Sequence, residues 1–202
     1  STEQAARFER EARITGRLDH PGIVPIHALK SDQRGKPFYV MRFVDGQTLQ
    51  ETIQQLHSGF PDSGAGSLFE SVAFRQLLQN FVTVCNIVAY AHGQGVIHRD
   101  IKPGNIILGP FGEVVLLDWG LARVHGESNL IPAAQDSDKG RLSEWDSDAF
   151  KTREGQILGT PAFASPEQLL GRTGEIEPRS DVYSLGATLF VLLTGASVNP
   201  AQ

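Results

Sequence analysis

The fold of this chain is decided by the stretch His98-Arg99-Asp100-Ile101-Lys102-Pro103-Gly104-Asn105, which is followed further on by Asp118-Trp119-Gly120. Together the two segments hold an acid, a cation, an amide and a second acid in a fixed order. Two short apolar runs at 106–109 and 114–117 lie between them, around a turn segment at 110–113 that contains proline and glycine. Short branched runs on either side of such a turn predict a β-hairpin.

The turn of this hairpin sets which residues face each other. A turn centred between Phe111 and Gly112 places Asn105 opposite Asp118. Amide and carboxylate oxygens at the open end of one hairpin can share a hard cation such as Mg²⁺, which prefers oxygen ligands. We therefore expect Asn105 and Asp118 to hold a metal ion together.

Composition excludes several classes of protein. The chain has 202 residues, of which 40% are hydrophobic and 20% charged, and a net charge of −5. A chain of this length can form one sizeable core or two small ones. Its negative net charge gives no whole-chain basic surface of the kind that binds nucleic acid. The single cysteine, Cys85, excludes an internal disulfide framework. The first residues do not resemble a signal peptide, and the longest apolar run, 182–193, is too short to span a bilayer.

Periodicity and capping signals predict the remaining elements. Thr48, with Glu51 three residues later, is typical of a helix N-terminus. Apolar residues at helical spacing predict a long buried helix in which Cys85 is a core thiol and not a nucleophile. The expected helices cover residues 2–18, 48–57, 69–92 and 181–193. The expected strands outside the hairpin cover residues 23–29, 38–43 and 96–97.

The order of residues in 98–105 and 118–120 resembles the catalytic loop and the metal-binding motif of protein kinases. The whole pattern is similar to the eukaryotic-like Ser/Thr protein kinases that bacteria also carry. It implies an α+β kinase fold, with a partial small lobe and hinge in 1–44 and a partial, mostly helical large lobe in 45–202. Residues 118–167 would form a long activation segment.

The resemblance implies transfer of the γ-phosphate of ATP to a Ser or Thr hydroxyl of a protein, with Mg²⁺ or Mn²⁺. Asp100 would orient or accept the hydroxyl proton, and Lys102 would neutralise the γ-phosphate. Asn105 and Asp118 would hold the metal ion. Thr160 resembles the substrate-side threonine that bonds the catalytic acid and lysine. Each residue alone fits a turn, a cap or a solvated side chain, and only their combination points to catalysis.

Nucleotide binding would involve the end of the second strand. By resemblance Met41 is the gatekeeper, the backbone around Phe43 in the hinge bonds adenine, and Asp45 lies near the ribose edge. Ile107 is counted with these nucleotide-binding residues. Taken alone, Asp45 with the glycine after it is an ordinary turn.

The N-terminal helix would supply Glu11, the acid that pairs with the lysine that grips ATP. Glu9 is the alternative if the register is shifted by half a turn, and an isolated glutamate here is otherwise a solvated surface charge. Neither a glycine-rich loop nor a strand lysine precedes Glu11 in this sequence. We expect both upstream of residue 1 and the last large-lobe helices after Gly195, so these 202 residues alone should have little or no activity.

Four residues are expected to support the site: His98, Trp119, Glu167 and Asp181. Trp119 stands where the family has phenylalanine and would pack beside His98. Glu167 belongs to Ser165-Pro166-Glu167, which replaces Ala-Pro-Glu, and its usual arginine partner lies in a later helix. Asp181 would cap the last helix and accept hydrogen bonds from the backbone around His98.

Regulation is expected at Arg99, because an arginine beside the catalytic acid can pair with a phosphorylated residue of the activation segment. Residues 126–156 are polar and acidic and should form a mobile loop. Thr152 is the first candidate phosphosite, followed by Ser147 and Ser143.

Two other functions compete with catalysis. A non-catalytic pseudokinase scaffold would have no need for all four polar residues of the site. A small-molecule phosphotransferase would not need Thr160 or the segment at 165–167. We expect a cytoplasmic location, which includes the cytoplasmic part of a membrane-anchored kinase, and no nucleic acid partner.

Overall fold

The computed structural model describes residues 15–32, 35, 37–59, 65–119, 122–124 and 161–196. The described α-helices are α2 (Leu49–Ser58), α3 (Ala65–Glu70), α4 (Val72–Gly93), α6 (Pro166–Leu169) and α7 (Pro178–Thr194). The described strands are β1 (Ile26–Ser31), β2 (Pro37–Met41), β3 (Gln47–Thr48), β4 (Val96–Ile97), β5 (Ile106–Leu108), β6 (Val114–Leu116) and β7 (Arg123–Val124). Short 3-10 turns are η1 (Pro103–Asn105), η2 (Pro161–Phe163) and η3 (Thr173–Glu175).

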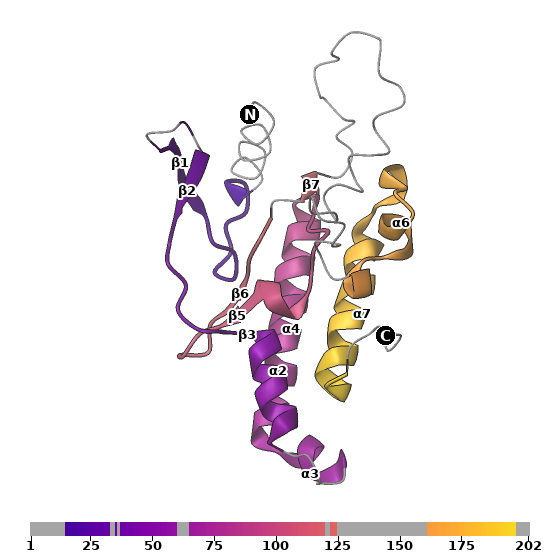
Figure 1. Cartoon of the computed structure of the whole chain (residues 1–202). Coiled ribbons are helices and arrows are strands. Elements are labelled where there is room, and N and C mark those ends of the chain that lie inside the picture. The colour runs from indigo at the N-terminus through magenta and orange to yellow at the C-terminus, as the bar shows by residue number, and fades with distance from the viewer. Residues whose placement is uncertain are drawn as a thin grey trace.

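The strands of the described residues form three small antiparallel sheets. β1 pairs with β2, β3 pairs with β5 and β5 with β6, and β4 pairs with β7. Figure 1 shows the β1–β2 hairpin set apart from the helices, while α7 runs alongside α4. In these parts of the chain no helix combines the length and the apolar character that crossing a membrane requires.

Helix α4 carries the core. Its apolar face, expected from helical spacing, is buried against α7 and β6. Cys85 lies half-buried beside this face, and burial raises the pKa of its thiol, so the thiolate is disfavoured. The buried residues of α4 are Phe74, Leu77, Phe81, Val84, Ile87, Val88 and Ala91.

The single helix expected over 69–92 is two helices. Ser71 separates α3 from α4, and its Oγ accepts a hydrogen bond from Phe74 N at 3.1 Å. A serine side chain that bonds the backbone competes with the helix ladder and favours a new N-terminus. α3 begins at Ala65, four residues before the expected start of that helix. The capping box at Thr48 is confirmed, since Glu51 N donates to Thr48 Oγ1 at 3.1 Å and Thr48 N to Glu51 Oε2 at 2.8 Å.

The first strand begins later than expected because its first residues pack elsewhere. Ile23 forms a parallel bridge with Leu116 of β6, and Leu116 N donates to Gly22 O at 2.9 Å. Gly22 lies so close to α4 that an added Cβ would sit 2.3 Å from Ile87 Cδ1. The second strand ends at Met41, two residues before the expected end.

The register of the β5–β6 hairpin differs from the expected one by one residue. Ile106 faces Leu116, and Leu117 N donates to Asn105 O at 2.8 Å, so Asn105 lies opposite Leu117 and not Asp118. The loop between Gly109 and Glu113 is the reason. It is closed by a hydrogen bond from Gly109 N to Glu113 O at 2.8 Å, and Gly112 has a φ of 87°. A loop of this odd length, with its last residue left-handed, centres on one residue and not on a peptide bond.

Gly22→Ala tests how the segment around Gly22, which precedes β1, packs against α4. The new methyl group would meet the Ile87 side chain, so we expect a loss of about 1–3 kcal/mol of stability from overpacking. Ile87→Val removes the atom in closest approach and should lower the cost of Gly22→Ala in the double variant. Urea unfolding of the full-length protein, followed by circular dichroism, measures these differences.

Gly93→Ala is the matched control, because nothing lies within 4 Å of a Cβ at this position. It should leave stability unchanged or raise it by about 0.4–1 kcal/mol. Equal effects of Gly22→Ala and Gly93→Ala would contradict the close packing at Gly22.

Candidate active site

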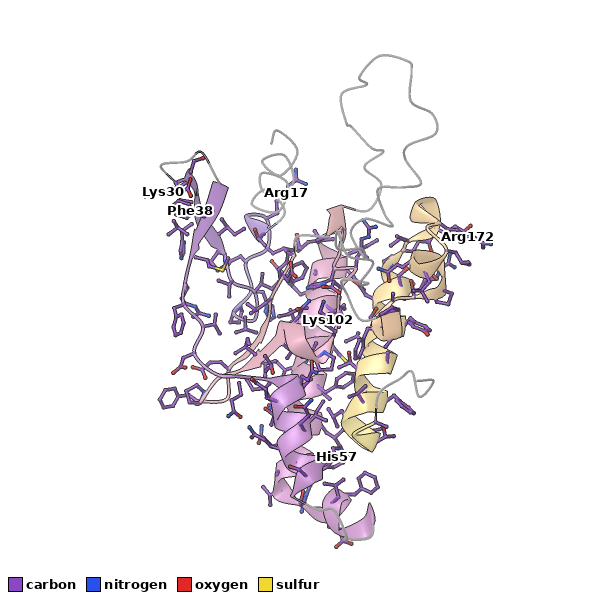
Figure 2. All side chains as sticks on the ribbon, in the orientation of Figure 1. Arg17, Lys30, Phe38, His57, Lys102 and Arg172 are labelled. Carbon is purple, nitrogen blue, oxygen red and sulfur yellow. The ribbon has the colours of Figure 1, made fainter. Side chains whose placement is uncertain are left out.

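The catalytic-loop residues predicted from the sequence lie in one cluster. Asp100 Oδ2 accepts a hydrogen bond from Lys102 Nζ at 2.7 Å and from Asn105 Nδ2 at 3.0 Å. Asn105 Nδ2 also donates to Asp100 O at 2.8 Å. The turn η1, which starts at Pro103, brings Asn105 back to Asp100, and Asn105 N donates to Lys102 O at 3.0 Å. Figure 2 shows Lys102 near the middle of the view, in the region of the helices.

The backbone is strained at two residues of this region. Arg99 and Asp118 are the described non-glycine residues with a positive φ, 74° and 63°. Such conformations cost of the order of 1–3 kcal/mol and persist where the surroundings hold them. Arg99 directly precedes Asp100, and Asp118 follows the end of the β5–β6 hairpin.

Asp118 is joined to the catalytic loop through the residue before it. Leu117 N donates to Asn105 O, and His98 Nε2 donates to Leu117 O at 3.1 Å. Asp118 itself is exposed. The candidate metal ligands are therefore neighbours through Leu117 although they are not cross-strand partners.

The donor set fits a hard cation. The Nδ2 group of Asn105 is used by Asp100, which leaves its Oδ1 as an acceptor, and Asp118 offers a carboxylate. Mg²⁺ binds through one or two such groups together with substrate phosphates. The described residues contain no cluster of three or more His, Cys, Asp or Glu side chains that could hold a metal ion by themselves.

His98 is buried and neutral. Its Nδ1 accepts a hydrogen bond from Asp100 N at 3.2 Å, which assigns the ring proton to Nε2, the donor to Leu117 O. Burial lowers the pKa of His98, and nearby carboxylates, Asp181 first, only partly oppose this. Trp119 packs against the ring as expected, with ring centroids 4.5 Å apart, and its Nε1 donates to Leu116 O at 3.1 Å.

Asp181 is completely buried beneath the catalytic loop. Its Oδ2 accepts from His98 N at 2.9 Å, and its Oδ1 accepts from Arg99 N at 2.8 Å, which are the backbone bonds expected for this residue. Its expected role as helix cap is wrong. α7 starts at Pro178 with Glu177 as N-cap, so Asp181 lies within the first turn.

A role for His92 in supporting the site was not predicted from the sequence. It lies in the last turn of α4, and its Nε2 is 2.7 Å from Asp181 Oδ2. The two residues are 89 positions apart, so no local spacing could have linked them.

Two buried serines of α7 donate hydrogen bonds to the segment that contains η2 and α6. Ser180 Oγ donates to Glu167 Oε1, and this bond is the main reason why the pKa of Glu167 is lowered. Ser184 Oγ donates to Phe163 O at 2.7 Å. Both serines were missed, although their spacing of four residues on an apolar helix marks one polar, inward face.

The nucleotide-side residues are placed only in part. Met41 ends β2, and Phe43 and Asp45 follow it as exposed residues, with Phe43 86% exposed. This stretch leads into β3, where Thr48 pairs with Ile107 of β5. The structure thus connects the expected hinge to Ile107, and their contact with a nucleotide stays a prediction.

Several predicted residues lie outside the described residues. They are Glu9, Glu11, Ser143, Ser147, Thr152 and Thr160, together with the polar loop 126–156.

Comparison with known proteins agrees with this geometry. The family model of the protein kinase domain matches residues 1–202. The serine/threonine-protein kinase PknD of Protochlamydia amoebophila is 39% identical over 193 residues, which cover 93% of this chain and 18% of that protein. The PknD proteins of Chlamydia pneumoniae and Chlamydia muridarum are each 36% identical, over 93% of this chain and 19% and 20% of their own lengths.

The chain thus spans about a fifth of the length of these relatives. The match confirms the family and the α+β kinase fold expected from the sequence. The chain therefore belongs to the protein kinase family and is similar to bacterial serine/threonine-protein kinases.

Proposed function

We propose that this kinase domain, within the full-length protein, transfers the γ-phosphate of ATP to Ser or Thr hydroxyls of a protein substrate. The observation that carries the proposal is the cluster in which Lys102 Nζ and Asn105 Nδ2 both donate to Asp100 Oδ2. Phosphoryl transfer needs little covalent help from a protein and depends on positioning and on neutralising charge. A cluster of one acid, one cation and one amide supplies both.

Asp100 acts as the proton acceptor in this proposal. Its carboxylate is oriented by two donors, and its backbone N–H is held by His98. A carboxylate held in this way can accept the proton of an incoming hydroxyl without first reorganising. Lys102 would bond both Asp100 and the phosphate, because an ammonium group has three donors.

The metal ion, when bound, neutralises the charge of the phosphate groups. Asn105 Oδ1 and the Asp118 carboxylate would hold it, with Mg²⁺ or Mn²⁺ as the fitting ions. Met41, Phe43, Asp45 and Ile107 remain our candidates for nucleotide binding.

The roles outside the described residues stay part of the proposal. Glu11 would pair with an ATP-binding lysine, and Thr160 would bond the substrate side of the cluster. Arg99 would pair with phosphorylated Thr152. Use of ATP agrees with a cytoplasmic location of this domain, which we also propose.

Asp100→Asn tests the assignment of the base. The amide keeps the shape of the side chain but cannot take up the proton, so we expect kcat in the full-length protein to fall by about 10²–10⁴-fold. The affinity for ATP should change little. Radiolabelled phosphate transfer and calorimetric ATP binding measure the two quantities.

Asp19→Asn is the control for this substitution, since Asp19 is exposed in the loop before Gly22 and far in sequence from the cluster. It should leave kcat unchanged. A loss that appears as weaker ATP binding would show that Asp100 is misassigned. Lack of phosphate transfer by the wild-type full-length protein would contradict the proposed function and favour a non-catalytic pseudokinase scaffold.

Asp118→Asn tests the metal site. Loss of a negative ligand should raise the Mg²⁺ concentration needed for half-maximal nucleotide binding by about tenfold, which corresponds to about 1.4 kcal/mol. A titration of nucleotide binding with Mg²⁺ measures this shift, with Asp19→Asn as control. An unchanged Mg²⁺ dependence would remove Asp118 from the metal site.

A further inference from the structure

Gln168 makes a long-range contact with the catalytic loop that the proposed mechanism has not used. It lies in α6, is 8% exposed, and its Nε2 donates to Arg99 O at 2.7 Å across 69 residues of sequence. This bond joins the segment that ends in Ser165-Pro166-Glu167 to the residue directly before Asp100.

The orientation of the Gln168 amide is determined by its other partners. Its Oε1 accepts hydrogen bonds from Ser165 N at 3.0 Å and from Ser165 Oγ at 3.0 Å. A backbone N–H can only donate, so the oxygen must face Ser165. The Nε2 group must then face the Arg99 carbonyl.

The bond acts on the peptide group that carries Asp100. The C=O of this peptide is the carbonyl of Arg99, which accepts a hydrogen bond from Gln168 Nε2. Its N–H is that of Asp100, which donates to His98 Nδ1 at 3.2 Å. Both polar ends of the Arg99–Asp100 peptide are therefore fixed by side chains. The plane of that peptide sets the direction in which the Asp100 side chain leaves the backbone.

The preceding peptide is held as well, because Asp181 Oδ1 accepts from Arg99 N. Arg99 has a φ of 74°, a conformation that a non-glycine residue leaves readily unless it is held. Without the Gln168 bond, the carbonyl of Arg99 would lose its buried partner while the strain remained.

We infer that Gln168 is a positioning residue for Asp100, which it controls through the Arg99–Asp100 peptide. The inference rests on the proposed function, because the positioned group is the proton acceptor of that reaction. It also makes the placement of the acid depend on the placement of the 165–168 turn. The sequence pattern Ser165-x-x-Gln168, a capping-box signature, is the signal that could have pointed to this residue.

Gln168→Glu is the sharpest test. The carboxylate keeps the acceptor for Ser165 but turns an oxygen toward the Arg99 carbonyl, so the bond is replaced by repulsion. We expect kcat of the full-length protein to fall about 10–100-fold at about pH 8, with the KM for ATP within about twofold of wild type. Phosphate-transfer kinetics over a range of pH measure both.

The pH dependence distinguishes positioning from a general loss of structure. Burial and the facing carbonyl raise the pKa of the introduced carboxyl, and its protonated form can again donate to Arg99 O. The ratio of the Gln168→Glu to the wild-type kcat should therefore rise as the pH falls toward about 6. Gln168→Met, which has no donor at any pH, should lose activity without this recovery and provides a neutral variant if the glutamate does not fold.

Gln76→Glu is the matched control. Gln76 is exposed on α4 and bonds Asn80, so the substitution adds the same charge away from the loop. It should leave kcat and its pH profile as in wild type. Hydrogen exchange adds a readout that does not need activity: amides of the 98–105 stretch should exchange faster in Gln168→Met and not in Gln76→Glu.

The outcomes separate this inference from the proposed function. An active wild type with unchanged kcat and exchange in both Gln168 variants overturns the inference and leaves the proposed function standing. An inactive wild type overturns the proposed function and, with it, any catalytic role of Gln168. Reduced kcat in Gln168→Glu with the same ratio to wild type at every pH overturns the donor role argued here.

Discussion

The rest of the site depends on the burial of one carboxylate, that of Asp181. A buried charge costs several kcal/mol unless hydrogen bonds compensate for it. Here the backbone N–H groups of His98 and Arg99 and the ring of His92 surround its two oxygens at 2.7–2.9 Å. These donors belong to the end of α4 and to the catalytic loop, while Asp181 belongs to α7. One side chain therefore holds three separate parts of the chain at one point.

The same contact stabilises an otherwise unfavourable backbone. Arg99 has a left-handed conformation, and its N–H and C=O are both bonded by side chains, of Asp181 and of Gln168. Because these two side chains come from later parts of the chain, the conformation cannot be stable in the isolated loop. The energy of tertiary packing is thus used to place Asp100.

The hairpin shows how a small local detail changes a site. The turn around Phe111 has an odd number of loop residues, which shifts the pairing so that Asn105 meets Leu117. Asp118 then leaves the hairpin with a positive φ and is exposed. The candidate metal ligands Asn105 and Asp118 remain neighbours, because Leu117, which directly precedes Asp118, is hydrogen-bonded to Asn105 and to His98.

Local sequence determined the features whose partners lie within a few residues. The Asp100, Lys102 and Asn105 cluster, the Thr48–Glu51 capping box and the apolar face of α4 are of this kind, since turn and helix geometry alone brings their members together. The motif order was also sufficient to identify the family.

Only the tertiary structure decided which distant side chains support these features. The contacts of Asp181 with His92 and of Gln168 with Arg99 join residues far apart in sequence, and the late start of β1 follows from the packing of Ile23 against β6. Spacing along a chain carries no information about such partners. They are selected by the need to pair every polar group that the packing of α4, α7 and the hairpin removes from water.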